Sequence, residues 1–221
     1  MKVVMGNKLR VAVAGGVAAM VAAGGFAVLN MGAADAQTTS TTATPARSQL
    51  LTVAEVRKAD PAHKWSIQVD KGILPKTYCG PASTEGRHVS SRMARGYTDD
   101  VAAWGAQYVS HYANAATARA AYNSVIATLK TCTYSKPSPT HARKITENRV
   151  VKGASGDLTQ VIRWYDYPKP SDPGSEAGGF PYAVTLKGTN VSVLAFREMG
   201  PGVAAPNFDK LARAAAVKLP R

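Results

Sequence analysis

The sequence predicts an α+β domain in which an antiparallel sheet is flanked by two main helices and held by one disulfide. Several segments alternate apolar and polar residues with the period of a strand. Two others repeat apolar residues every three or four positions, as amphipathic helices do. The chain also contains two cysteines. Because the connections between predicted strands are short, antiparallel neighbours are expected.

The first half begins with a helix and continues with strands. Thr52 and Glu55 have the spacing of a capping box, which predicts a short helix through about Lys58. Strands are expected at 65–69, 89–97 and 103–112, with a loop at 70–86. Asn114 is expected to cap a long helix. The apolar face of that helix comprises Ala118, Ala121, Tyr122, Val125, Ile126 and Leu129.

The second half is predicted to be rich in strands. They are expected at 150–151, 158–167, 182–187 and 191–197, with 188–190 as the hairpin loop between the last two. The Pro- and Gly-rich stretch 167–179 is expected to be an exposed excursion. Asn207 is expected to cap the final helix. The inner face of that helix comprises Phe208, Leu211, Ala212 and Ala215.

The N-terminal residues have the order of a secretory signal peptide. Basic residues (Lys2, Lys8, Arg10) precede an apolar run at 11–29, and Ala34-Asp35-Ala36 forms an A-x-A cleavage site. An uncleaved anchor is the alternative, since the run approaches the roughly 20 residues that span a bilayer. Its abundance of Ala and Gly, and the cleavage site, favour removal.

We therefore expect three parts in the chain: a cleavable signal peptide (1–36), a flexible Thr- and Ser-rich leader (37–48), and one extracellular domain (49–221). No membrane span is expected after cleavage. The domain is expected to be secreted and monomeric.

Cys79 and Cys132 are expected to form a structural disulfide. Export places them where disulfides persist, and an even number of cysteines fits one bridge. A redox pair or a metal site would require closer spacing or further ligands, and no C-x-x-C motif is present.

The charge balance limits the classes of partner. Residues 37–221 contain 24 Lys and Arg against 13 Asp and Glu, a net charge of +11. Outside the cell this surplus does not favour nucleic acid, and it fits an anionic wall polymer, phospholipid headgroups or an acidic ligand. The alternative is a charged surface that serves only solubility.

Motifs of catalysis and cofactor binding are absent from the sequence. There is no G-x-S-x-G elbow, no H-E-x-x-H motif and no phosphate-binding glycine loop, and the four histidines are scattered. The adjacent carboxylates Asp99 and Asp100 are expected to cap a turn. No cofactor and no metal are expected, although a site assembled from distant residues stays open.

Aromatic and cationic residues of the predicted sheet are the candidate ligand-binding residues. Such side chains can stack on and pair with an anionic ligand in a groove. The alternative is that the aromatic residues of strand 103–112 pack beneath a helix. The candidates are Arg92, Trp104, Tyr108, Tyr112, Arg163 and Tyr165.

The order of features resembles a known family. The features that carry the resemblance are spread along the domain. They are Leu50-Leu51-Thr52, Trp65, Cys79, the run 107–112, an Ala-rich helix with Ala116 and Ala121, Cys132, and a final helix with Leu211-Ala212 and Val217. The order of these features resembles that in the actinobacterial extracellular sensor domains of the PknH-type receptor Ser/Thr kinases. The resemblance spans nearly all of 49–221.

That resemblance implies an α+β fold with a cleft for an unidentified envelope ligand, and it supplies no catalytic residues. Two departures matter. The kinase exteriors carry a second disulfide that two cysteines cannot make, and this sequence contains no kinase domain, so signalling is not carried over.

The leading hypothesis is a secreted, non-catalytic, sensor-type domain that binds an unknown small-molecule or envelope ligand, with an anionic one suspected. The alternatives are a cell-envelope hydrolase or transferase with a dispersed site, and a structural protein that contacts anionic wall polymers.

Overall fold

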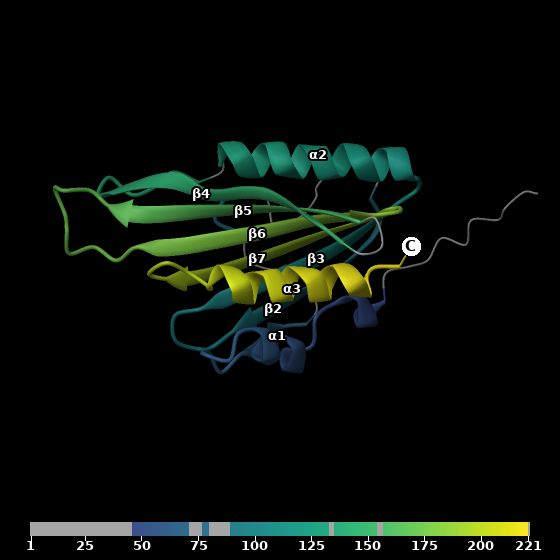
Figure 1. Ribbon diagram of the computed structural model, residues 1–221, viewed down its shortest axis with the longest axis horizontal. Coiled ribbons are helices and arrows are strands. Elements are labelled where there is room, and N and C mark those ends of the chain that lie inside the picture. The colour runs from purple at the N-terminus through teal and green to yellow at the C-terminus, as the bar shows by residue number, and fades with distance from the viewer. Residues whose placement is uncertain (1–45, 71–76, 80–88, 133–134, 154–156, 221) are drawn as a thin grey trace, which may run out of the picture. The chain divides into compact units, whose positions relative to one another are not determined.

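An antiparallel sheet of seven strands organises the residues that the computed structural model describes, which are 46–70, 77–79, 89–132, 135–153 and 157–220 (Figure 1). The predicted α+β class is confirmed. The strands are β1 (Ser66–Val69), β2 (Val89–Thr98), β3 (Trp104–Tyr112), β4 (His141–Lys152), β5 (Leu158–Pro168), β6 (Gly178–Lys187) and β7 (Asn190–Met199). The helices are η1 (Arg47–Gln49), α1 (Val53–Ala59), α2 (Ala115–Thr131) and α3 (Ala205–Lys218).

The sheet consists of two meanders joined in its middle. Its strand order is β1-β2-β3-β7-β6-β5-β4, so consecutive strands pair within each half. The junction is the ladder between β3 and β7, in which Trp104 lies opposite Arg197 and Ala106 opposite Ala195. α2 connects β3 to β4 at the far edge.

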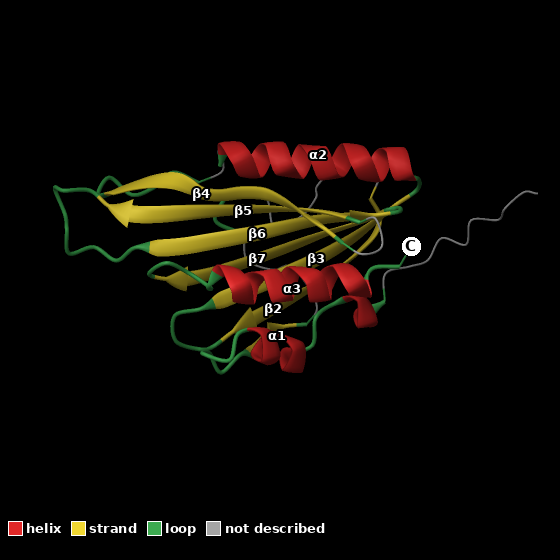
Figure 2. Cartoon of the chain, in the orientation of Figure 1, coloured by secondary structure: helices red, strands yellow, loops and turns green. Residues whose placement is uncertain are grey.

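Both faces of the sheet are covered by helices (Figure 2). Since successive side chains of a strand point to opposite faces, the interior strands contribute to two cores. On one face, Tyr122 and Leu129 of α2 pack with Tyr182 and Val193. On the other face, α1 and α3 pack with residues such as Phe196. The expected inner faces of the two main helices are therefore confirmed.

The two N-caps predicted for the first helices are confirmed. Thr52 and Glu55 form the complete capping box of α1, with the Thr52 amide donating to the Glu55 carboxylate at 2.7 Å. The Asn114 side chain accepts from the amide of Thr117 at 2.8 Å and begins α2.

The cap predicted for the last helix was wrong. α3 begins earlier, after Ala204, because Pro206 suits the first turn of a helix, where its missing N–H has no partner to lose. Asn207 lies inside α3 and donates from its side chain to Asp60 at 3.1 Å.

The prediction for β4 was too short. Two residues, 150–151, were expected, and the strand runs over His141–Lys152. β4 is an edge strand, and those of its residues whose burial is described are half-buried or exposed. Without a buried face it shows no apolar alternation that would reveal its length.

Several expectations concern residues outside the described ranges. The signal peptide (1–36), nearly all of the leader (37–48) and most of the loop at 70–86 belong to them, and these assignments stay predictions. No helix in the described ranges is long and apolar enough to cross a membrane.

The predicted disulfide is present. Cys79 and Cys132 are bonded, and both are buried. Cys132 is the C-cap of α2, in the left-handed conformation with φ of 47°. The bridge therefore fixes the end of α2 to the segment 77–79.

We expect the double variant Cys79→Ala/Cys132→Ala to be less stable than the oxidised protein. A bridge that closes a loop of 53 residues restricts the unfolded chain, a contribution of about 4 kcal/mol. For a domain of this size the melting temperature should fall by roughly 8–15 °C, as measured by calorimetry. Added reductant should leave the double variant unchanged. Equal melting temperatures for the two proteins would contradict a stabilising role.

Candidate ligand-binding cleft

A cavity of about 410 Å³ opens on the face of the sheet that carries α2. Figure 1 shows the strands continuing past the C-terminal end of α2, so no helix of the described ranges lies over this part of the face. The described residues that line the cavity come from three central strands and from neighbouring segments. They are Gln68, Thr77, Tyr78, Trp104, Gly105, Ala106, Ser135, Phe180, Tyr182, Ala195, Phe196 and Arg197.

Small side chains make the floor of the cleft hollow. Ala106 of β3 lies opposite Ala195 of β7, which in turn lies opposite Tyr182 of β6. The methyl groups of Ala106 and Ala195 lie next to the row in which Trp104 pairs with Arg197, and they leave space beside these larger side chains. The depression is therefore a consequence of strand register, since it requires two alanines to meet at the β3–β7 junction.

A cation stacked on an aromatic ring lies at the mouth of the cleft. The guanidinium carbon of Arg197 lies 4.9 Å from the centroid of the Trp104 ring and 6.0 Å from that of Phe180. Trp104 is 36% exposed, and Arg197 is exposed as well. Arg197 forms no ion pair with a carboxylate of the described residues. This arrangement holds an exposed cation at the cleft.

Tyr78 forms a wall of the cleft. Its ring stacks on Phe180, with centroids 3.8 Å apart and an angle of 11° between the planes. Its hydroxyl donates to the Asp166 carboxylate. Burial, together with this hydrogen bond to an anion, raises the pKa of Tyr78, so the phenol stays protonated.

The disulfide holds this wall in place. Cys79 follows Tyr78, and its amide donates to the Tyr182 hydroxyl at 2.9 Å. Arg143 of β4 donates to Cys132 Sγ at 2.8 Å, and its guanidinium carbon lies 5.7 Å from the centroid of the Tyr78 ring. The bridge thus connects the end of α2 to an aromatic wall backed by a second arginine.

The six candidate residues from the sequence do not line one groove. Trp104 lines the cleft. Tyr108 and Tyr112 lie in the core on the α2 face, with 3% and 0% exposure, as the alternative interpretation had them. Arg92 is exposed on β2.

Arg163 and Tyr165 belong to the opposite face. Arg163 is buried, pairs with Glu147 at 3.2 Å and donates to the Val203 carbonyl at 2.7 Å. Tyr165 stacks with Tyr167. The prediction that the six residues line one groove was therefore wrong. Which side chains of β3 and β5 share a face depends on the strand order, which the sequence did not reveal. Ligand binding by any of them stays a prediction.

The sequence did not point to Tyr78, Phe180 or Arg197. Arg197 stands at the end of a strand that was predicted, but only the β3–β7 pairing brings it to Trp104. A signal was present in the two alanines, Ala106 and Ala195, each of which lies two residues from a large side chain on the same face of its strand, Trp104 and Arg197 respectively.

A separate cluster of charged groups surrounds His63 on the other face of the sheet. His63 Nδ1 lies 2.9 Å from Asp60 Oδ2, and Nε2 lies 3.0 Å from Glu198 Oε1 and 3.9 Å from Asp99 Oδ2. Asp60 also accepts from the Trp65 indole at 3.0 Å. The cluster fastens the segment after α1 to the end of β7.

Asp99 has the structural role expected of it. Its Oδ1 accepts from the amides of Val101, Ala102 and Ala103 at 2.8–3.0 Å, which forms the turn between β2 and β3. Within the described ranges, no group of three or more His, Cys, Asp and Glu side chains is arranged to hold a metal ion.

The electrostatic environment of the cluster favours a charged imidazole. Desolvation lowers the pKa of His63, but the hydrogen bond to Asp60 and the charges of Glu198, Asp60 and Asp99 outweigh it, so the pKa is raised. Desolvation also raises the pKa of Glu198, against the attraction of His63.

The fold is similar to that of a solved extracellular domain. The crystal structure of the extracellular domain of PknH from Mycobacterium tuberculosis matches with a TM-score of 0.53 and 14% sequence identity, covering 77% of this chain and 92% of that one. At this identity the likeness shows the fold alone, and it confirms the sequence resemblance at that level. No protein-family model and no curated protein matches the chain.

The His63 cluster predicts a stability that depends on pH. Because the folded-state pKa of His63 lies above its unfolded value of about 6.5, protonation adds stability that is complete below that value and is lost as the pH rises through the folded pKa. The raised pKa of Glu198 acts in the same direction. The melting temperature of the wild type should therefore exceed that of His63→Gln most near pH 6.

The measurement is a series of thermal melts from about pH 5.5 to 8.5. His141→Gln is the matched control, because His141 contacts Ser138, Thr140 and the Glu176 carbonyl and no carboxylate. A difference between wild type and His63→Gln that stays constant, or grows toward alkaline pH, would contradict the assignment.

Proposed function

We propose that this chain is an exported, non-catalytic ligand-binding domain of the sensor type. We propose further that its cleft takes a small ligand with an anionic group next to an apolar or aromatic face. Trp104, Tyr78 and Phe180 would contact that face, and Arg197 would bind the anion. A volume of about 410 Å³ falls within the range of small-molecule sites, about 300–1,000 Å³.

The observation that carries the proposal is the stack of Arg197 on Trp104 at 4.9 Å. A cation over an exposed ring gains about 0.5–1 kcal/mol, enough to orient the guanidinium. A hydrogen bond to a charged group contributes about 1.5–3 kcal/mol, and a guanidinium can bind a carboxylate or phosphate through two parallel bonds. The hydrogen bonds between a bound anion and Arg197 would therefore contribute more free energy than the stacking of Arg197 on Trp104 does.

The composition of the lining supports binding over catalysis. Its described residues provide hydroxyls from Thr77, Tyr78, Ser135 and Tyr182 but no imidazole, carboxylate or thiol. The Tyr78 hydroxyl donates to Asp166, but burial raises the pKa of both phenols, which disfavours a phenolate nucleophile. A hydroxyl nucleophile needs an adjacent base. The histidine with carboxylate partners, His63, contacts Glu198, whose side chain points to the opposite face from that of Arg197. Both observations count against a hydrolase or transferase at this cleft.

Three features support export. They are the signal-peptide pattern at 1–36, the buried disulfide, and the similarity of fold to an extracellular domain. The leader at 37–48 and the single domain at 49–221 belong to the same proposal. The ligand would then be a soluble component of the envelope or its surroundings, such as a muropeptide or a free phospholipid headgroup.

A thermal-shift screen of the exported, oxidised protein tests this function. The panel comprises muropeptides, phosphate-bearing lipid headgroups and aromatic carboxylates, each beside a neutral analogue. A ligand at about 100 times its dissociation constant stabilises by roughly 2.7 kcal/mol, which corresponds to a melting shift of about 5–10 °C. We expect anionic members to produce such a shift and their neutral analogues to produce little.

Two variants locate the site. Arg197→Gln should weaken binding at least tenfold, since it removes the hydrogen bonds of the cation. Arg119→Gln, an exposed position on α2 that does not line the cleft, should bind like the wild type. The proposal fails if no anionic compound shifts the melt, or if both variants lose binding equally.

A further inference from the structure

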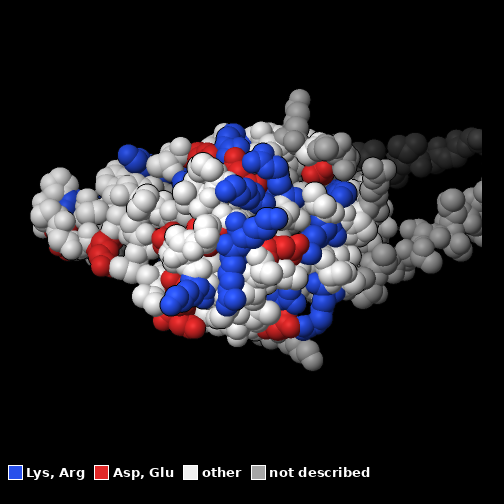
Figure 3. Space-filling view, turned by 60° about the horizontal axis from the view of Figure 1, so that its bottom comes forward, with Lys and Arg blue, Asp and Glu red and all other residues white. Residues whose placement is uncertain are grey.

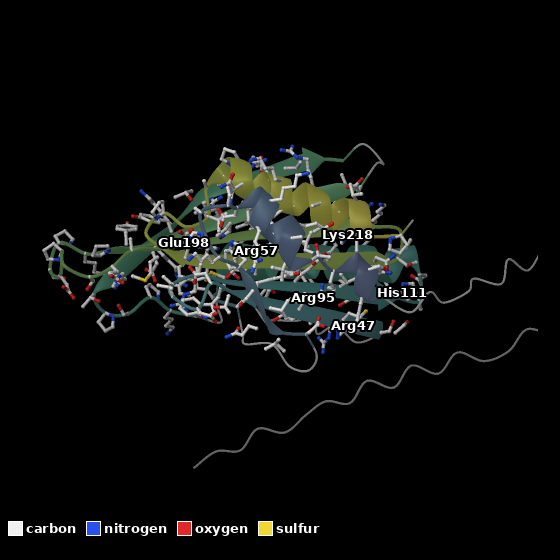
Figure 4. All side chains as sticks on the ribbon, turned by 90° about the horizontal axis from the view of Figure 1, so that it is seen from below. Arg47, Arg57, Arg95, His111, Glu198 and Lys218 are labelled. Carbon is white, nitrogen blue, oxygen red and sulfur yellow. A yellow bond between two sulfur atoms is a disulfide. The ribbon has the colours of Figure 1, made fainter. Side chains whose placement is uncertain are left out.

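The helices on the face opposite the cleft carry a surplus of exposed cations. α1 contributes Arg57 and Lys58, and α3 contributes Lys210 and Arg213, all of them exposed. α1 and α3 lie side by side, as Figure 4 shows from below. In Figure 3, which looks onto these helices, Lys and Arg side chains form a band across the middle of the face, with acidic groups beside it.

The acidic side chains of the two helices are already paired. Glu55 accepts from Lys218 at 2.9 Å, in addition to its role in the capping box. Asp209 is paired with Arg149 of β4. At the margin of this face, Arg47 and Arg95 share Asp70. No exposed carboxylate of α1 or α3 therefore remains to neutralise the surplus.

The remaining cations have no such partner. Lys58, Lys210 and Arg213 form no ion pair within the described ranges, and the contact found for Lys210 is a 3.5 Å hydrogen bond to Asn207. Val217, which is 78% exposed, adds an apolar side chain to the same helix. A helix with free cations and an exposed apolar residue suits the headgroup region of a bilayer.

We propose that α1 and α3 dock on the surface of an anionic phospholipid bilayer, with the cleft turned away from the lipid. The proposal concerns a surface separate from the cleft and does not depend on the ligand of the cleft. The cations would contact lipid phosphates, and each Lys or Arg near an anionic bilayer strengthens attachment by about fivefold.

The position of the chain upstream of the domain favours a bilayer over a soluble polymer as the partner. η1 begins at Arg47 and packs near α3, and the apolar run at 11–29 lies only residues 30–46 upstream. The 17 residues 30–46 span at most about 60 Å, at about 3.6 Å per residue, so a signal peptide held in the membrane would bring the basic face close to a bilayer. After cleavage, the charge of the face itself would have to hold the domain there.

Cosedimentation of the exported protein with large vesicles tests the proposal. One set contains phosphatidylcholine alone, and the other contains about 30% phosphatidylglycerol. We expect binding to the anionic vesicles only, weakening as salt rises because screening shortens the reach of the charges. Lys210→Glu/Arg213→Glu should reduce the partition coefficient at least about tenfold.

The matched control is Arg119→Glu/Lys130→Glu, which makes the same change in charge at exposed positions of α2, on the other face. It should retain most of the binding, and thermal melts check that both variants are folded. Equal loss in the two variants would mean that net charge, and not this face, governs attachment. Absence of binding to anionic vesicles, or equal binding to neutral ones, would overturn the proposal.

Discussion

The pairing of β3 with β7 is the constraint on which the rest of the structure depends. It joins two meanders whose paired residues are 79 (His111 and Asn190) to 93 (Trp104 and Arg197) positions apart in the sequence. It makes β3, β7 and β6 interior strands that helices cover on both faces. It also sets the register that places Trp104 against Arg197 and Ala106 against Ala195. A slip of one residue would turn every one of these side chains to the other face, so the core and the cleft are specified together.

The second determinant of the cleft is the residue at which α2 ends. A helix that continued past Cys132 would cover the floor between Trp104 and Phe180, as it covers Tyr108 and Tyr112 nearer its start. Cys132 ends the helix in the left-handed conformation, and its bond to Cys79 brings Tyr78 against Phe180. The disulfide therefore also shapes the cleft. It lies where α2 ends, and it holds Tyr78 as a wall beside the part of the sheet that α2 does not cover.

Local patterns were sufficient to predict most elements but not the site. The Thr52–Glu55 box, the Asn114 cap and the inner faces of α2 and α3 follow from short-range spacing, because their partners lie within a few turns. β4 was underestimated because an edge strand has no buried face to create a pattern. Arg163 was assigned to a groove with Trp104 although it faces α3, since relative faces depend on a pairing that sequence spacing does not encode. The cleft is a property of strand order and helix length, which is why its residues were missed.

The two faces of the domain thus have different chemistry: an aromatic cleft with Arg197 on one, and a basic helical layer on the other. The central claim is that an anionic ligand enters the cleft at Trp104. The chain has three tryptophans, and Trp65 is fully buried on the opposite face, so their indole N–H signals form an internal comparison. We would record ¹H–¹⁵N spectra of the oxidised protein during titration with the anionic muropeptides and aromatic carboxylates. A saturable shift of the Trp104 indole with Trp65 unmoved is the predicted result, and a compound that stabilises the protein without moving Trp104 would contradict it.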